Sequence, residues 1–118
     1  SSKAKKMKKI VLFIKNFQKA AKVSEKLAAL NAEIQFLGPN FDDVSDCSLA
    51  IIDLNESDFS NSDFLRKLNT NSNIFIVGYV SKVVKKSHDK FKYEGCNMIL
   101  SNASILKNIE RIAREALR

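Results

Sequence analysis

The chain has 118 residues, of which 45% are hydrophobic and 28% charged, and it contains a single proline. A chain of this length has room for one globular domain whose core forms without metal ions or disulfides, so collagen-like, mucin-like and disordered proteins are excluded. Lys and Arg number 20 against 13 Asp and Glu, which gives a formal net charge of +7. This excess favours acidic partners through long-range attraction but does not identify them.

The positive charge is concentrated at the start of the chain, where five lysines fall within the first nine residues. We interpret residues 1–8 as a mobile basic arm that precedes one domain at residues 9–118. The apolar run at residues 10–14 is too short for the core of a signal peptide or for a membrane span. The sequence therefore predicts a cytoplasmic protein without a membrane segment.

Five apolar runs predict five β-strands. Most of them are continuous runs of β-branched and aromatic residues, which is typical of strands covered on both faces of a sheet. The run at 32–37 is weaker than the others. The predicted strands cover residues 10–14, 32–37, 48–53, 73–80 and 96–100.

The segments between these strands predict helices. After the first strand, apolar residues three or four apart predict an amphipathic helix that packs on the sheet. Its inner stripe is Phe17, Ala20, Val23, Leu27 and Leu30. The acidic segment at 41–46 is short enough for only about one helical turn, and residues 63–68 predict a further helix.

Two more helices are predicted in the last third of the chain. One is capped near Ser81, carries Val83, Val84 and Phe91 inward, and ends at Gly95. The other is capped by Ser101 or Asn102. Its predicted inner face is Ile105, Ile109, Ile112 and Ala116. This last helix reaches residue 118 without Gly or Pro, which leaves open that the chain is a piece of a longer protein.

Strands that alternate with helices of this length indicate a parallel sheet, because right-handed crossovers place each helix over a face of the sheet. Five such strands fit the order 2-1-3-4-5 in a three-layer α/β fold. Ligands of such sheets bind beyond the carboxyl ends of the strands. The residues expected to converge there are Lys15, Asn16, Asp53, Gly78, Tyr79, Ser101 and Asn102.

Two stretches of the chain resemble the receiver domains of bacterial two-component response regulators. Residues 49–54, LAIIDL, are similar to the strand that ends in the family's phosphoacceptor aspartate, and residues 95–97, GCN, are similar to the Gly-Ala-Asp before the last strand. The resemblance covers residues 8–117. It implies a flavodoxin-like fold with a shortened second helix, and it places Asp53 at the phosphoacceptor position.

The other positions of the family's site differ from the family pattern. Lys15 and Asn16 stand where receivers have the two acidic residues that hold magnesium. Gly78 stands in place of a serine or threonine, and Asn102 and Ala103 stand in place of a lysine and a proline. Of these functional residues, the resemblance retains only the aspartate.

These differences predict a pocket that does not support phosphorylation. Aspartyl phosphorylation depends on a divalent cation held by several oxygen ligands, and Lys15 offers none. We expect the Lys15 ammonium to compete for the magnesium position and to pair with Asp53. The sequence thus indicates a pseudo-receiver that is not an enzyme, holds no metal or cofactor, and acts as a protein-interaction module in bacterial signal transduction. An alternative is a regulator phosphorylated at Asp53 with unconventional support from Lys15.

Other chemistries have less support. The three glycines lie far apart, so the chain has no glycine-rich phosphate loop. His88 has no second histidine or cysteine at ligand spacing, and we predict it to be partly buried. Cys47 and Cys96 belong to strands separated by another strand, roughly 10 Å apart, which predicts two free, buried thiols.

Lysines gather on the predicted fourth helix. In receivers this helix, the fifth strand and the fifth helix form the usual partner or dimer surface. We expect another signalling protein, or a domain of the same parent chain, to bind Lys82, Lys85, Lys86, Lys90, Lys107 and Arg111. A homodimer through this surface and a merely solvated basic helix stay open. So does a polyanion-binding module, although nucleic acid should bind only weakly because recognition motifs are absent.

Overall fold

The computed structural model describes residues 7–70 and 73–118, so the predicted basic arm at 1–8 lies almost entirely outside the described residues. No helix within these two ranges is long and apolar enough to cross a membrane. The elements are β1 (Lys9–Phe13), α1 (Phe17–Leu27) with a 3-10 turn (Ala28–Leu30), β2 (Glu33–Phe36), β3 (Leu49–Asp53), α2 (Ser57–Ser60), α3 (Ser62–Asn69), β4 (Phe75–Val80), α4 (Lys85–Tyr93), β5 (Met98–Ser101) and α5 (Asn102–Ala116).

The five strands form one parallel sheet in the order β2-β1-β3-β4-β5, which confirms the predicted topology. Every residue of the central strand β3 is buried, as its continuous apolar sequence predicts. The register pairs Asp53, the last residue of β3, with Tyr79 of β4. Because all strands run in the same direction, their carboxyl ends meet at one edge of the sheet.

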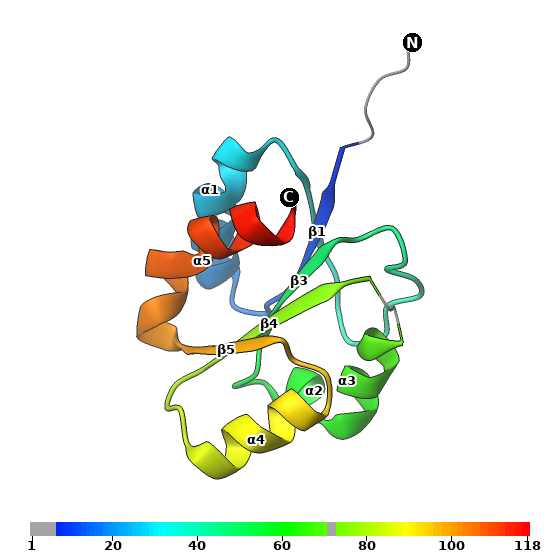
Figure 1. Ribbon diagram of the computed structural model, residues 1–118, viewed down its shortest axis with the longest axis vertical. Helices are drawn as coiled ribbons and strands as arrows, with labels where there is room; N and C mark the ends of the chain where they lie inside the picture. Colours follow the sequence, from blue (N-terminus) through cyan, green and yellow to red (C-terminus); the bar gives the residue numbers. More distant parts are fainter. Residues whose placement is uncertain (1–6, 71–72) are drawn as a thin grey trace.

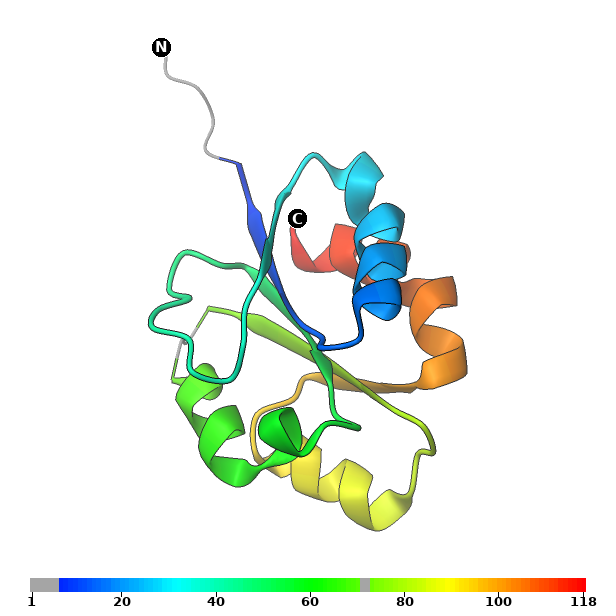
Figure 2. The same cartoon turned by 180° about the vertical axis from the view of Figure 1, so that it is seen from behind.

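Helices cover both faces of the sheet, with α1 and α5 on one face and α2, α3 and α4 on the other (Figures 1 and 2). Successive side chains of a strand point to opposite faces. Accordingly, Leu49 and Ile51 join the core beneath α1 and α5, whereas Ala50 and Ile52 join the core beneath the other helices. The three-layer α/β architecture is therefore as predicted.

The connection between β2 and β3 contains turns but no helix, although all of residues 37–48 are described. The expected single helical turn at 41–46 is wrong. The segment nevertheless contributes Phe41 and Val44 to the core. The Phe41 ring packs 5.3 Å from that of Phe13 and 5.7 Å from that of Phe64, between ring centroids. Aromatic packing thus covers this part of the sheet where a longer helix would otherwise lie.

The first residue of α1 does not belong to its buried stripe. Phe17 is 84% exposed, and the buried residues begin at Ala20. Phe17 follows directly on the N-cap Asn16, at the edge of the sheet, so it has no strand beneath it to cover. The prediction that Phe17 faces the core is therefore wrong.

Helix α4 begins three residues later than predicted, because its N-cap is Val84 and not Ser81. Val83 and Val84 are each 47% exposed, and Val84 occupies the N-cap position, where its side chain cannot accept a hydrogen bond. The backbone amide of Ser81 donates to Asn55 Oδ1 at 2.7 Å, which holds this residue in the loop rather than in a helical cap. By contrast, the Ser101 side chain caps α5 as predicted, accepting from the Ser104 amide at 3.1 Å.

Candidate functional site

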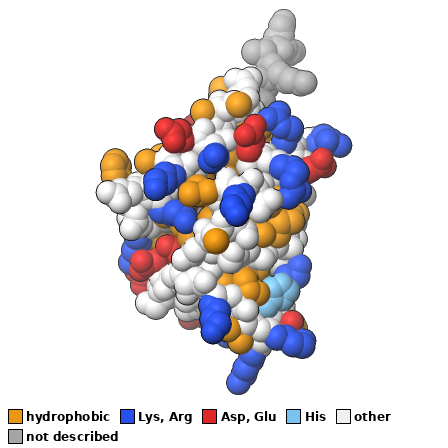
Figure 3. Space-filling model, turned by 90° about the vertical axis from the view of Figure 1, so that its left-hand side faces the viewer, with side chains coloured by type: hydrophobic (Ala, Val, Ile, Leu, Met, Phe, Trp, Pro, Cys, Tyr) orange, Lys and Arg blue, Asp and Glu red, His pale blue; other side chains and the backbone are white. Residues whose placement is uncertain are grey.

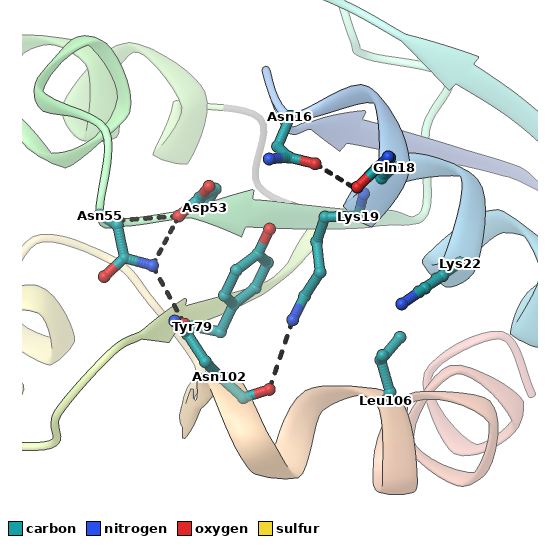
Figure 4. A pocket seen from close by; sticks show the side chains of 9 residues that line it. All are labelled: Asn16, Gln18, Lys19, Lys22, Asp53, Asn55, Tyr79, Asn102 and Leu106. Atoms are coloured by element: carbon teal, nitrogen blue, oxygen red, sulfur yellow. Dashed lines mark hydrogen bonds between the residues drawn. The ribbon is translucent and has the colours of Figure 1, made fainter.

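A polar cavity of about 310 Å³ opens at the carboxyl edge of the sheet, between α1 and α5 (Figure 4). Four residues predicted to lie in this pocket do line it: Asn16, Asp53, Tyr79 and Asn102. The other three, Lys15, Gly78 and Ser101, do not. The complete lining is Asn16, Gln18, Lys19, Lys22, Asp53, Asn55, Tyr79, Asn102 and Leu106.

Asp53 is the one buried charged residue in the described ranges, with 6% of its surface exposed. Its Oδ1 atom accepts hydrogen bonds from the backbone amide of Asn55 at 3.0 Å and from the Asn55 side-chain amide at 2.8 Å. Such bonds offset the cost of removing a carboxylate from water. Asp53 therefore shapes the turn that follows β3.

Asn55 connects this turn to two other elements. Its side-chain nitrogen also donates to Asn102 Oδ1 at 3.0 Å, and its side-chain oxygen accepts from the amide of Ser81. One amide side chain thus joins the end of β3, the loop after β4 and the start of α5. Asn55 is not among the residues predicted for the pocket, although its place two residues after Asp53 is typical of an Asx turn.

Lys15 does not contact Asp53, so the predicted ion pair is wrong. Its ammonium group pairs instead with the carboxylate of Asp58 in α2, and both side chains are 46% exposed. The hydrogen bond with Asp58 raises the pKa of Lys15. An exposed ion pair avoids the desolvation that a lysine would incur beside a buried carboxylate, and Asp53 already has Asn55 as its donor.

Gly78 is covered by Leu54. A β-carbon at Gly78 would lie 2.3 Å from Cδ1 and 2.9 Å from Cγ of Leu54, well inside the roughly 3.5–4.0 Å of ordinary carbon contacts. Leu54 is itself only 4% exposed. The Leu54 side chain therefore occupies the space that a serine or threonine at position 78 would need.

Tyr79 brings a phenol into the pocket. The residue is 2% exposed, and its hydroxyl is buried. Burial raises the pKa of Tyr79 well above its usual value, and the charge of the nearby Asp53 and a hydrogen bond with its carboxylate raise it further. The hydroxyl is therefore protonated at neutral pH and can act as a donor.

Two lysines of α1 complete the pocket. Lys19 and Lys22 are three residues apart and therefore lie on the same side of the helix. The Lys19 ammonium lies 5.2 Å from the centre of the Tyr79 ring and donates to the backbone oxygen of Asn102 at 3.4 Å. Neither lysine is among the residues predicted for the pocket, although their spacing of three residues is a sequence signal that they share one side of the helix.

The lining contains little that could hold a metal ion. Asp53 is its only carboxylate, and the remaining polar groups are amides, ammonium groups and a phenol. Across residues 7–70 and 73–118, no group of three or more His, Cys, Asp or Glu residues is arranged to bind a metal. His88 is partly buried, as predicted, and Cys47 and Cys96 are the predicted free, buried thiols.

The basic residues predicted to bind a partner are all exposed. Lys85 pairs with Asp89, and Lys90 pairs with Glu94. Lys82, Lys86 and Lys107 have no ion-pair partner within the part of the chain that the structure describes. Figure 3 shows a group of Lys and Arg side chains at the lower end of the molecule, where Figure 1 places α4.

Large apolar side chains are exposed at both ends of α4. Val83 and Val84 precede α4, and Tyr93, the last residue of α4, is 92% exposed. Aromatic residues are enriched in protein interfaces relative to the rest of the surface. We refer to Lys82, Val83, Val84, Lys86 and Tyr93 as the α4 surface.

The sequence matches no protein-family model and no curated protein. Several solved structures, however, have a fold similar to that of this chain. The BeF3-activated receiver domain of DrrB matches 95% of this chain and 98% of its own, with a TM-score of 0.80 and 19% identity. The chain has the fold of a receiver domain.

Two further structures with this fold illustrate its range. A response regulator from Thermotoga maritima matches 95% of this chain and 98% of its own, with a TM-score of 0.75 and 8% identity. A CpaE protein assigned to pilus assembly in Burkholderia thailandensis matches 94% and 98%, with a TM-score of 0.75 and 10% identity. At these identities the similarity concerns the fold, and the function must be argued from the site.

Proposed function

We propose that this chain is a pseudo-receiver, a receiver-fold domain of a bacterial signalling system that binds a partner protein and does not carry out phosphoryl transfer. The main observation behind the proposal is that no other carboxylate lines the pocket beside Asp53. Among the residues that line the pocket it is the only carboxylate, and Asn55 already donates two hydrogen bonds to it.

The chemistry of aspartyl phosphorylation explains why the lack of further carboxylates matters. The transferred group carries negative charge that a divalent cation must neutralise, and magnesium takes about six oxygen ligands in octahedral geometry. One carboxylate beside two ammonium groups is a poor match for such an ion. Leu54 also leaves no room for a hydroxyl at position 78. The alternative in which Lys15 assists Asp53 loses support, because Lys15 pairs with Asp58.

A phosphodonor experiment tests this part of the proposal. The chain is incubated with acetyl phosphate and magnesium, and intact-mass spectrometry follows the product, with a phosphorylatable receiver treated in parallel. We expect no phosphorylated species. A labile adduct that forms on the wild type but not on Asp53→Asn would contradict the proposal and favour a phosphorylation-competent regulator.

The α4 surface supports the second part of the proposal, the binding of a partner. It combines unpaired lysines with exposed apolar side chains, and α4 borders β5 at the edge of the sheet. The chain's net charge of +7 favours an acidic protein as the partner. Receiver folds occur both in response regulators and in a CpaE pilus protein, so the proposal specifies the mode of action and not the pathway.

Charge reversal on matched helices tests the surface. Lys86→Glu alters α4, and Lys26→Glu makes the same charge change on α1. We expect proteins recovered by the immobilised wild type to be retained by Lys26→Glu and lost by Lys86→Glu. Equal recovery with both variants would exclude the α4 surface. DNA binding that persists above physiological salt would instead favour a polyanion-binding module, because nonspecific phosphate contacts weaken steeply with ionic strength.

A further inference from the structure

An apolar groove of about 640 Å³ lies between α1 and β2 and shares no lining residue with the polar pocket. At one end stand Phe17, the first residue of α1, and Phe36, the last residue of β2, which are 84% and 56% exposed. Toward the other end α1 lines the groove with the small side chains of Ala21, Ser24 and Ala28. The groove therefore has a bulky end and an end with room for a further side chain.

The strand beside this groove is an edge of the sheet. Within residues 7–70 and 73–118, β2 pairs with β1 alone. The backbone amides of Glu33 and Leu37 donate to backbone oxygens on the β1 side. Because alternate residues of a parallel strand turn their backbone groups to the same neighbour, the amides of Ile34 and Phe36 point to the open edge. Such an edge is a template for pairing with another strand.

We propose that this groove is the interface of a symmetric homodimer, in which β2 of each copy pairs antiparallel with β2 of the other. A twofold rotation reverses the groove, so the bulky end of one copy meets the small-residue end of the other. Phe17 then packs against Ser24 and Ala28 of the partner subunit. A patch that fits its own copy in this way meets the requirement of a twofold contact, in which both subunits use the same surface.

The strand register follows from the same rotation. When Ile34 of one copy lies opposite Phe36 of the other, both residues turn their backbone groups toward the partner strand and can exchange hydrogen bonds. Their side chains lie on the face covered by α1, where they make apolar cross-strand pairs. Glu33 then lies opposite Leu37 of the partner subunit, so the two Glu33 carboxylates do not face each other.

The charges around the groove favour a second copy as the occupant. Lys15 lies at the bulky end and Glu25 at the small-residue end, and the other seven lining residues are uncharged. The rotation brings the Lys15 ammonium of one copy toward the Glu25 carboxylate of the other, while Lys15 keeps Asp58 of its own copy as a neighbour. On a basic surface such as the α4 surface, two copies would instead repel each other.

The size of the patch predicts a weak dimer. Burying the exposed parts of Phe17 and Phe36 removes roughly 300 Å² per copy from water, taking about 200 Å² for a whole phenylalanine. Stable complexes bury about 800 Å² per partner, so the strand edge and the rest of the groove must supply the difference. We expect a dissociation constant in the micromolar range. The dimer leaves the α4 surface free, because β2 and β5 are opposite edges of the sheet, and it does not depend on the proposed function.

Sedimentation velocity of the complete chain, at protein concentrations up to the millimolar range, tests the proposal. We expect the sedimentation coefficient to rise from the monomer to the dimer value. Ala21→Glu places a carboxylate in the groove at an exposed position of α1 and should weaken the dimer at least about tenfold. It lowers the positive net charge, so general repulsion would not explain the loss. Ala103→Glu makes the same change at an exposed position of α5, outside the groove, and should leave the dimer unchanged.

Hydrogen exchange followed by NMR tests the strand pairing on the wild type itself. The amides of Ile34 and Phe36 should exchange more slowly as the protein concentration rises, because they become hydrogen-bonded in the dimer. Unchanged exchange of these amides in a dimer would overturn the proposal, as would equal weakening by Ala21→Glu and Ala103→Glu. A chain that stays monomeric at millimolar concentration would also overturn it, and would leave the groove to a strand or helix of another protein.

Discussion

Replacing Gly78 by alanine tests whether Leu54 fills the space beside the pocket. The new β-carbon would lie 2.3 Å from Leu54 Cδ1, more than 1 Å closer than the roughly 3.5 Å of an ordinary contact. Leu54 is buried and would have to change its rotamer, and such overpacking costs about 1–3 kcal/mol. Alanine recovers about 0.5–1 kcal/mol relative to glycine in a strand. We therefore expect Gly78→Ala to lower the free energy of unfolding by about 1–2 kcal/mol.

The sign of this effect should change when Leu54 is shortened. Leu54→Ala alone should cost about 2–5 kcal/mol, because it leaves a cavity in the core. In that background Gly78→Ala no longer meets a side chain and should be neutral or stabilising. The two substitutions should thus show a coupling energy of about 1–3 kcal/mol.

Urea unfolding followed by circular dichroism, on the wild type, both single variants and the double variant, measures this coupling. The dependence on urea concentration should be the same for all four proteins, so that the midpoints report stability alone. Equal costs of Gly78→Ala in both backgrounds would refute the reasoning, as would a gain in stability from Gly78→Ala alone. Either result would mean that Leu54 does not fill this space.

Two further predictions concern side chains outside the pocket. Burial raises the pKa of Glu94, but hydrogen bonds from Ser62 and Lys90 outweigh burial and leave the pKa below its usual value. Such a group stabilises the fold above its unfolded-state pKa and loses that contribution as the pH falls through the folded-state pKa. Glu94→Gln should therefore lower the free energy of unfolding by about 1 kcal/mol at pH 7. The difference between the variant and the wild type should vanish as the pH falls below about 4. Urea titrations that find the same difference at every pH would contradict this prediction. Burial raises the pKa of Cys47 to about 11 and that of Cys96 to about 12. A thiol reagent at pH 8 should therefore label the two cysteines only in urea. Rapid labelling of the native protein would contradict this prediction.

The sheet could be predicted well from the sequence because its strands are covered on both faces. A strand in that position can contain only apolar residues along its length, and β3 shows this directly, with every residue buried. Asp53 then follows from the pattern as the polar residue that ends a buried strand at the carboxyl edge. The position of Asp53 could therefore be predicted from the sequence of this strand alone.

Helix ends were predicted less well, because they depend on local hydrogen bonds that a hydrophobic pattern does not reveal. Ser81 has the right side chain for a helix cap, yet its amide is bound by Asn55, and α4 starts after Val84 instead. Phe17 fits the apolar spacing of α1 but lies past the end of the strands. In both cases the residue type suited the predicted role, but a tertiary contact for Ser81 and the position beyond the strands for Phe17 prevented it.

The sequence by itself indicated the three layers, the parallel strand order and the position of Asp53 at the end of a buried strand, because apolar runs locate the strands and right-handed crossovers arrange them. Only the tertiary structure decided which groups surround that carboxylate. Asp58 attracts Lys15 to the exposed side of α2, and Lys19 of α1 takes a place above Tyr79. These choices depend on contacts between helices far apart in the sequence and on the cost of desolvating each charge, and neither can be read from residue spacing alone.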